Sequence, residues 1–332
     1  MRIVHPRAAR ILIFVAATAL ASCASPAHDP DEKYVFIAAG IKQPFWQEAR
    51  AGFMDAASTL GVKVEVAGPD TLSPKDELTT FQNAVMMHPT GILLSAADPD
   101  LFKSEINSAI TQQIPVICID TDVPDSQRLL YIGTDNFRAG GESARRMAAV
   151  LKGQGNVLIV GDSGEFNVNE RVRGATQALA NYRGIKISDA LDGKGDSRAA
   201  SDQVVAVLES KKKIDGIIAL DTTASEGAAD ALHRLNRDGE IQIVAFGEDP
   251  ETLDRISHGT IAATIAQKPY IMTYYGLKFL DDLHHAVVHQ SGNWHVAPAL
   301  PLPTWVDTGT TVVDKNNLGV VLNARAAYQA PK

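Results

Sequence analysis

The stretch IPVICIDTDVPDSQRLLYIGTDN, residues 114–136, determines how the rest of the chain is interpreted. Its run at 116–119 is apolar on both faces and rich in β-branched residues, which is typical of a strand covered by helices on both sides. Asp120 follows at the carboxyl end of that strand, where open α/β sheets bind their ligands. A second short strand is expected at 129–132, so two strands follow each other directly. We interpret this break in the alternation of strands and helices as the passage from one lobe to another.

Strands and helices alternate on both sides of this stretch. The sequence predicts further strands at 34–39, 62–66, 91–95, 156–160, 185–190, 214–220, 241–246 and 261–266. Most are separated by helical segments, which give the crossover length that parallel strands require. At 332 residues the chain is long enough for two lobes. These observations predict an α/β fold with two Rossmann-like lobes built on parallel sheets.

The first residues predict an export signal. Three arginines precede the apolar run 11–21, which is too short to cross a bilayer as a helix but fits the core of a signal peptide. The run leads into LASC at positions 20–23, which resembles the lipobox of bacterial lipoproteins, where the cysteine is acylated and becomes the first residue. A plain signal peptide that contains a cysteine is the alternative. We expect residues 1–22 to be removed and Cys23 to carry lipid.

The mature chain is acidic. Residues 1–22 hold three arginines and no acidic residue, so their removal changes the net charge from −8 to −11. Such a charge argues against nucleic acid as a partner, because phosphate binding needs a basic face. Cys118 is then the only cysteine besides Cys23, so no internal disulfide is expected. The polar residues 23–32 are expected to form a tether between the lipid and the fold.

Two motifs resemble other kinds of site, one a serine nucleophile and the other a metal site. GDSG at positions 161–164 follows a hydrophobic strand and resembles the first block of GDSL-type esterases, with residues 281–284 supplying an Asp-x-x-His. The esterase pattern places its serine after the first strand of the fold, and its glycine–asparagine–aspartate block is missing here, so a Ser163 hydrolase is the weaker hypothesis. His285 and His289 are spaced to share a metal on a helix, but no acidic third ligand is placed convincingly. We therefore expect neither catalysis nor a bound metal.

Seven segments match one family in chain order. They are QPFW (43–46), PVICID (115–120), GTDN (133–136), NERVRG (169–174), ALD (219–221), VAF (244–246) and IAATIAQ (261–267). With these segments the chain resembles the type I periplasmic sugar-binding proteins, specifically the ribose-binding-protein cluster, over nearly all of the mature sequence. The last segment is especially specific.

The resemblance implies the type I periplasmic-binding-protein fold. Its two α/β lobes are joined by a hinge of three crossings and close on one ligand. Residues 33–134 and 269–304 would form the N-terminal lobe, and residues 135–268 and 305–332 the C-terminal lobe.

The resemblance also implies which residues hold the ligand. They are Gln43, Phe45, Trp46, Asp120, Thr121, Arg171, Asp221, Phe246, Glu248 and Gln267. A sugar offers C–H faces that pack on aromatic rings, and adjacent hydroxyls that carboxylates, amides and guanidinium groups grip in pairs. Core packing is the alternative for Trp46 and Phe246, and an ordinary solvated turn is the alternative for Asp120.

Several positions depart from the family pattern. Thr121 replaces a frequent arginine, and Asp221 replaces the usual asparagine. Gly195 stands where an aromatic residue is expected, and Gly247 and Glu248 follow Phe246 in place of an aspartate. The expected site loses one cation and gains or relocates acids, which disfavours a sugar phosphate or sugar acid. A neutral pentose, hexose or cyclitol is favoured, with a cationic or amino sugar as the alternative.

We expect a solute-binding lipoprotein that captures this ligand in the periplasm or at the cell surface and delivers it to the membrane permease of an ABC importer. The protein is expected to be a monomer without a cofactor. The alternative from another class is a ligand-loaded sensory receptor that feeds a chemoreceptor or histidine kinase. The serine hydrolase is the third and weakest hypothesis.

Overall fold

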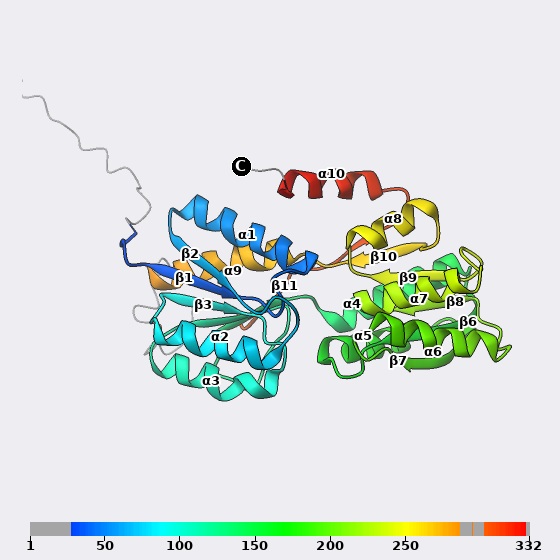
Figure 1. Ribbon diagram of the computed structural model, residues 1–332, viewed down its shortest axis with the longest axis horizontal. Helices are drawn as coiled ribbons and strands as arrows, with labels where there is room; N and C mark the ends of the chain where they lie inside the picture. Colours follow the sequence, from blue (N-terminus) through cyan, green and yellow to red (C-terminus); the bar gives the residue numbers. More distant parts are fainter. Residues whose placement is uncertain (1–27, 286–293, 295–301, 330–332) are drawn as a thin grey trace, which may run out of the picture.

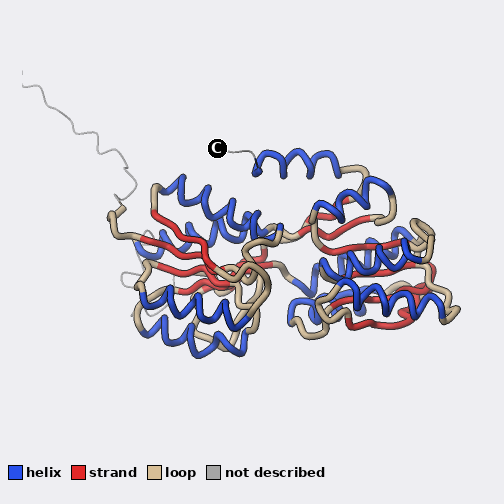
Figure 2. Tube along the Cα trace, in the orientation of Figure 1, coloured by secondary structure: helices blue, strands red, loops and turns tan. Residues whose placement is uncertain are grey.

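The computed structural model describes residues 28–285, 294 and 302–329, which form two α/β lobes side by side (Figure 1). Each lobe contains a six-stranded sheet, and strands alternate with helices along the chain (Figure 2). The predicted α/β class and the two-lobe organisation are confirmed. The signal segment and Cys23 lie outside the described residues. Within the described part of the chain, no helix is long and apolar enough to span a membrane.

The first lobe is built on a parallel sheet with the strand order β11-β5-β4-β3-β1-β2. Its strands are β1 (Lys33–Ile37), β2 (Lys63–Ala67), β3 (Gly91–Leu94), β4 (Val116–Ile119), β5 (Leu130–Gly133) and β11 (Trp305–Asp307). One face packs against α1 (Pro44–Leu60) and α9 (Pro269–His284), and the other against α2 (Pro74–Met86) and α3 (Pro99–Thr111). Because helices cover both faces, strands such as β4 are continuous apolar runs.

The second lobe repeats this plan with the order β12-β10-β9-β8-β6-β7, in which β12 runs antiparallel to β10. Its strands are β6 (Gln154–Gly161), β7 (Gly184–Asp192), β8 (Gly216–Ala219), β9 (Gln242–Phe246), β10 (Ala263–Ala266) and β12 (Thr311–Val313). One face packs against α4 (Asn136–Val150) and α5 (Phe166–Leu179). The other packs against α6 (Ser197–Glu209), α7 (Thr222–Arg234) and α8 (Pro250–His258), and α10 (Leu318–Gln329) lies beside α8.

The chain passes between the lobes three times, as the resemblance implied. The crossings lie directly after β5, directly after β10, and between β11 and β12. They bond to one another, since Gln267 Nε2 donates to Thr134 Oγ1 at 2.9 Å and Asp135 N donates to Asp307 Oδ1 at 3.1 Å. The expected lobe boundary after residue 304 differs from the structure. Because β11 pairs with β5, the first lobe continues to Asp307.

The end of the expected tether is part of the fold. Glu32 is buried, with an exposed fraction of 6%. His28 Nε2 lies 3.0 Å from Asp281 Oδ1, near the end of α9. The tether was expected to extend to residue 32, but the structure shows that residues 28–32 already belong to the first lobe, because His28 contacts Asp281 and Glu32 is buried.

Candidate ligand-binding cleft

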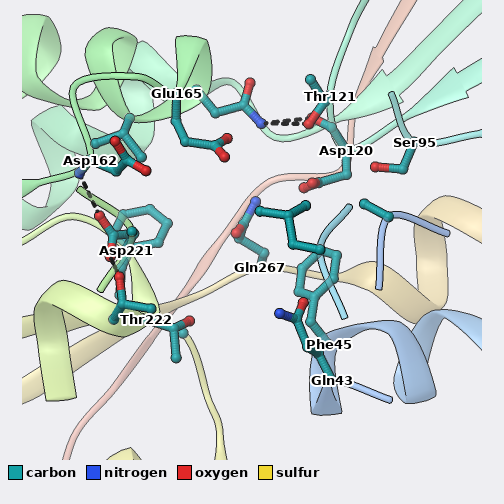
Figure 3. Close-up of a pocket in the computed structure, with 18 of the residues that line it drawn as sticks. Gln43, Phe45, Ser95, Asp120, Thr121, Asp162, Glu165, Asp221, Thr222 and Gln267 are labelled. Carbon is teal, nitrogen blue, oxygen red and sulfur yellow. Dashed lines mark hydrogen bonds between the residues drawn. The ribbon is translucent and has the colours of Figure 1, made fainter. Parts of the chain in front are cut away.

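A cavity of about 320 Å³ lies between the lobes, within the size range of small-molecule sites. Its walls include residues that follow strands of both sheets, so the carboxyl ends of both sheets face it. All ten residues expected at the site line this one cavity: Gln43, Phe45, Trp46, Asp120, Thr121, Arg171, Asp221, Phe246, Glu248 and Gln267. Figure 3 shows those of them that it labels approaching the cavity from both lobes and from the hinge: Gln43, Phe45, Asp120, Thr121, Asp221 and Gln267. Their contact with a ligand stays a prediction.

Asp120 has an unusual backbone conformation in this cleft. Its φ of +60° lies in the left-handed region, which non-glycine residues seldom adopt and aspartate tolerates better than most. The carbonyl oxygen accepts hydrogen bonds from Tyr131 Oη at 2.7 Å and from Asn167 Nδ2 at 3.2 Å. The carboxylate faces the cavity (Figure 3). Burial raises the pKa of Asp120, and the nearby Arg171 guanidinium opposes that rise.

Arg171, on α5, is the cation that faces this carboxylate. Its side chain is buried and donates to Asn136 Oδ1 at 2.8 Å, to Leu220 O at 2.9 Å and to Gln267 Oε1 at 3.2 Å. The guanidinium also stacks on the Phe246 ring, 4.1 Å from its centroid. Burial lowers the pKa of Arg171, while the carboxylates of the cleft raise it. The protein therefore fixes this cation before a ligand arrives.

Thr121 and Gln267 lie where the lobes meet. Asn167 Nδ2 of the second lobe donates to Thr121 Oγ1 of the first at 3.3 Å. Gln267 links Arg171 to Thr134 at the first crossing through its two amide atoms. A ligand group that bonds to either residue would bias the angle between the lobes.

Asp221 is largely used by the protein itself. It caps α7: Oδ1 accepts from Ala224 N at 2.7 Å and from Thr223 Oγ1 at 2.8 Å. Oδ2 accepts from Asp162 N at 2.9 Å. Since a carboxylate has about four lone-pair sites, about one remains for a ligand. Asp221 therefore holds two loops of the second-lobe wall in place as well as facing the cavity.

The aromatic residues present limited ring surface to the cavity. Trp46 has an exposed fraction of 6% and packs toward Phe36 in the core, with ring centroids 6.3 Å apart. Phe246 is buried, and the Arg171 guanidinium covers one face of its ring. Phe45 stands edge-on to Trp46, with centroids 4.7 Å apart, and is half-buried. Core packing accounts for most of the surface of Trp46 and Phe246, so Phe45 is the ring best placed to stack on a sugar.

The cleft is rich in carboxylates. Asp162 and Glu165 line it together with Asp120. Burial and the negative charges of Asp120 and Asp162 raise the pKa of Glu165 to about 7. Arg171 is the one cation among the described residues that line the cavity. An anionic ligand would meet uncompensated like charges here, whereas sugar hydroxyls can donate to carboxylates.

Several polar residues of the wall were not expected from the sequence. They are Ser95, Asp162, Glu165, Asn167, Thr222 and Thr223. Ser95 and Asp162 directly follow β3 and β6, so the strand-end rule that selected Asp120 could have found them. Ser95 Oγ is buried and has no hydrogen-bond partner among the described residues, which suits it to meet a ligand. No sequence signal indicates Asn167, because its role depends on contact with the other lobe.

The geometry contradicts the serine-hydrolase hypothesis. Ser163 is exposed in the loop between β6 and α5 of the second lobe. Asp281 and His284 lie at the end of α9 in the first lobe, where Asp281 contacts His28 and Tyr34. A nucleophile needs its base within hydrogen-bond reach. Pro269, at the start of α9, lines the cleft, and the 16 residues of the helix separate it by about 24 Å from the end that holds Asp281 and His284. This pair therefore cannot serve as the base for Ser163.

A pair of glutamates joins the two lobes beside the cleft. Glu48 of α1 and Glu248, which follows β9, share a hydrogen bond between their side chains, and the charge of Arg325 on α10 acts on both. Burial and the negative charge of Glu48 raise the pKa of Glu248 to about 8. The folded protein therefore holds a proton here that the unfolded chain releases at neutral pH.

We expect the free energy of unfolding to fall by on the order of 1 kcal/mol per pH unit as the pH rises from the ordinary pKa of a glutamate toward about 8, because in that range the folded protein keeps a proton on Glu248 that the unfolded chain has released. The slope should flatten above about pH 8, where Glu248 is deprotonated in both states. The Glu248→Gln variant should lose much of this slope, since its amide donates to Glu48 at every pH. Urea unfolding between about pH 6 and 9 measures the slope. Glu251→Gln, at a more exposed glutamate that pairs with Arg255, is the matched control. An unchanged slope in Glu248→Gln would assign it to other buried acids, such as Glu77.

Two α/β lobes joined by three crossings, with a carboxylate-lined cavity between them, define a solute-binding protein. The periplasmic binding protein domain matches residues 34–285, so the chain belongs to that family. Among its relatives, the D-allose-binding periplasmic protein of Escherichia coli K12 is 25% identical over 261 residues, which cover 75% of this chain and 84% of the relative.

Solved structures agree with this assignment. The arabinose-binding protein AraP from Geobacillus stearothermophilus superposes with a TM-score of 0.80 at 32% identity, covering 88% of this chain and 99% of AraP. The sugar-binding protein of a sugar ABC transporter from Bacillus halodurans gives a TM-score of 0.81 at 34% identity, covering 87% and 99% of the two chains. The resemblance to type I periplasmic binding proteins that the sequence indicated is confirmed.

Proposed function

We propose that this protein is the solute-binding component of an ABC importer and captures a small neutral sugar, either a pentose or hexose, or a cyclitol. The observation that carries the proposal is the cavity between the lobes, where carboxylates from both lobes lie around Arg171, the one buried cation that the described part of the chain places in its wall. Relatives named for allose, for arabinose and for sugar transport support the same ligand class and a transport role. No covalent step is part of this function, since hydrogen bonds and stacking hold the ligand while the lobes close.

The protein is expected to act in the periplasm or at the cell surface. Membership of the periplasmic binding protein family supports a periplasmic or extracellular location. The lipobox-like LASC sequence supports anchoring to the membrane through lipid on Cys23. Incorporation of a labelled fatty acid that disappears in Cys23→Ser is the measurement that checks the anchor.

Thermal unfolding of the purified protein against a ligand panel tests the ligand class. The panel contains arabinose, ribose, xylose, D-allose, inositol, a sugar acid, a sugar phosphate and an amino sugar. At about a thousandfold excess over Kd, the true ligand should stabilise the fold by about 4 kcal/mol. We expect this shift with a neutral compound and none with the sugar acid or phosphate. A shift with the amino sugar alone would overturn the neutral-ligand proposal, and no shift with any compound would overturn sugar capture.

A further inference from the structure

Four side chains of metal-binding type meet at the end of the first lobe that faces away from the cleft. They are His28, Glu32, Asp281 and His285, and one ligand atom from each lies within 4.8 Å of the others. His28 and Glu32 precede β1, whereas Asp281 and His285 lie one helical turn apart at the end of α9. Figure 1 shows the start of β1 and the end of α9 together at the outer end of the molecule, away from the second lobe.

The nitrogen and oxygen atoms of this cluster face one another. His28 Nε2 lies 3.0 Å from Asp281 Oδ1. His285 Nε2 lies 3.3 Å from Glu32 Oε2 and 3.6 Å from Asp281 Oδ1. The four side chains are nearly buried, with exposed fractions between 5% and 13%. Each imidazole therefore directs a nitrogen toward carboxylate oxygens in one small, largely dry volume.

Neighbouring groups hold both carboxylates in position. Tyr34 Oη donates to Asp281 Oδ1 at 3.3 Å, and Asp29 N donates to Glu32 Oε1 at 2.8 Å. The second bond leaves Glu32 Oε2 directed at His285. Hydrogen bonds of this kind orient the carboxylate ligands of metal sites.

We propose that His28, Glu32, Asp281 and His285 form a binding site for a divalent transition-metal ion of the zinc type. Two imidazole nitrogens and two carboxylate oxygens are a donor set that four-coordinate Zn²⁺ accepts. Ca²⁺ and Mg²⁺ prefer oxygen ligands and higher coordination numbers, so they fit this set poorly.

Of the two carboxylates beside His285, Asp281 precedes it by one helical turn, whereas Glu32 lies 253 residues away along the chain and could not be paired with it from the sequence. The partner that the spacing of the helix suggested, His289, lies outside the described residues. The structure instead supplies two carboxylates and a second imidazole from His28. His284 Nε2, 3.7 Å from Glu32 Oε1, adds a further imidazole at the edge of the cluster.

The ion would fasten residues 28–32, which precede β1, to the last turn of α9. The other end of this helix begins at Pro269, which lines the cleft, and 16 helical residues separate the two ends by about 24 Å. The metal ligands come from the segment before β1 and from the end of α9, which both belong to the first lobe, so the ion would stabilise that lobe. We therefore expect it to leave the affinity for sugar unchanged.

Calorimetric titration of Zn²⁺ into the purified protein, stripped with EDTA, tests the site. We expect a single ion per chain and a Tm that rises with Zn²⁺ but not with Ca²⁺ or Mg²⁺. His285→Gln should weaken Zn²⁺ binding at least as much as loss of an outer hydrogen-bond partner does, about 10- to 100-fold. His233→Gln, which removes an exposed imidazole paired with Asp238, is the matched control and should bind Zn²⁺ as the wild type does.

A second readout uses Co²⁺, which absorbs visible light strongly in four-coordinate sites. We expect this absorption in the wild type and its loss in His28→Gln. Thermal unfolding in EDTA establishes that each variant still folds. Unchanged Zn²⁺ affinity in both His28→Gln and His285→Gln would overturn the proposal. Absence of stoichiometric Zn²⁺ binding by the wild type would do the same, and would leave the cluster as a hydrogen-bonded network of histidines and carboxylates.

Discussion

The Asp120→Asn variant is expected to bind the sugar at least about 100-fold more weakly than the wild type. A hydrogen bond to a charged group contributes about 1.5–3 kcal/mol, and a carboxylate can accept two from adjacent hydroxyls. The substitution also leaves the buried Arg171 without the carboxylate that acts on it most strongly. Asparagine tolerates the φ of +60° at this position, so the backbone should keep its course. Titration calorimetry with the sugar that the panel identifies measures the change.

A second substitution of Asp120 and a control at a neighbouring carboxylate test this expectation. Asp120→Ala should lose at least as much affinity and some stability as well, because alanine is strained in the left-handed region. Asp125→Ala is the matched control. This carboxylate belongs to the same loop but is exposed, and its ion pair among the described residues is with Lys103, at 3.8 Å. Wild-type affinity in both Asp120 variants would remove Asp120 from the binding site.

The Arg171→Ala variant is expected to lose both sugar affinity and stability. Removal of the guanidinium leaves three acceptors without the donor that they share: Asn136 Oδ1, Leu220 O and Gln267 Oε1. Each unsatisfied buried acceptor costs about 1–3 kcal/mol, so the free energy of unfolding should fall by several kcal/mol. The affinity should fall at least about 100-fold, because the acids of the cleft lose their counter-charge. Urea unfolding without sugar measures the first effect, and calorimetry below the Tm measures the second.

Arg171→Lys separates charge from geometry. Lysine keeps the charge but lacks the planar fork that reaches three acceptors and stacks on Phe246. We expect its affinity and stability to fall between those of the wild type and Arg171→Ala. Arg173→Ala, two residues along α5 at an exposed guanidinium paired with Glu170, is the control and should change neither quantity strongly. An Arg171→Ala protein as stable and as tightly binding as the wild type would contradict the assigned role.

The fold could be predicted from the sequence because its buried strands are apolar on both faces and alternate with helices. The run 116–119 is one example, and it became the central strand β4. The strand-end rule led to Asp120 from the residues alone. Arg171 and Gln267 could be selected only through resemblance to a family. Arg171 lies within a helix, and its partners come from three different segments.

Features that depend on long-range contacts could not be predicted. The pair of Glu48 and Glu248 joins different lobes, and its shared proton arises from that contact. The lobe boundary was misplaced because the three residues of β11 carry too little pattern to show which sheet they join. How the Trp46 ring is shared between cavity and core could not be predicted either, since nothing local distinguishes a ring at the cavity from a ring that packs toward Phe36.

The position of α9 in the chain determines when the first lobe can become stable. One apolar face of the first sheet, which includes Leu93, Ile117 and Ile132, packs against Leu277 and Leu280 of α9. The ribosome synthesises the parallel strands β6 to β10 of the second lobe before it reaches this helix. An exposed apolar face in an incomplete domain promotes aggregation. The lobe that is begun first is therefore completed after most of its neighbour, and during that interval only α1 of the two helices that cover this face is in place.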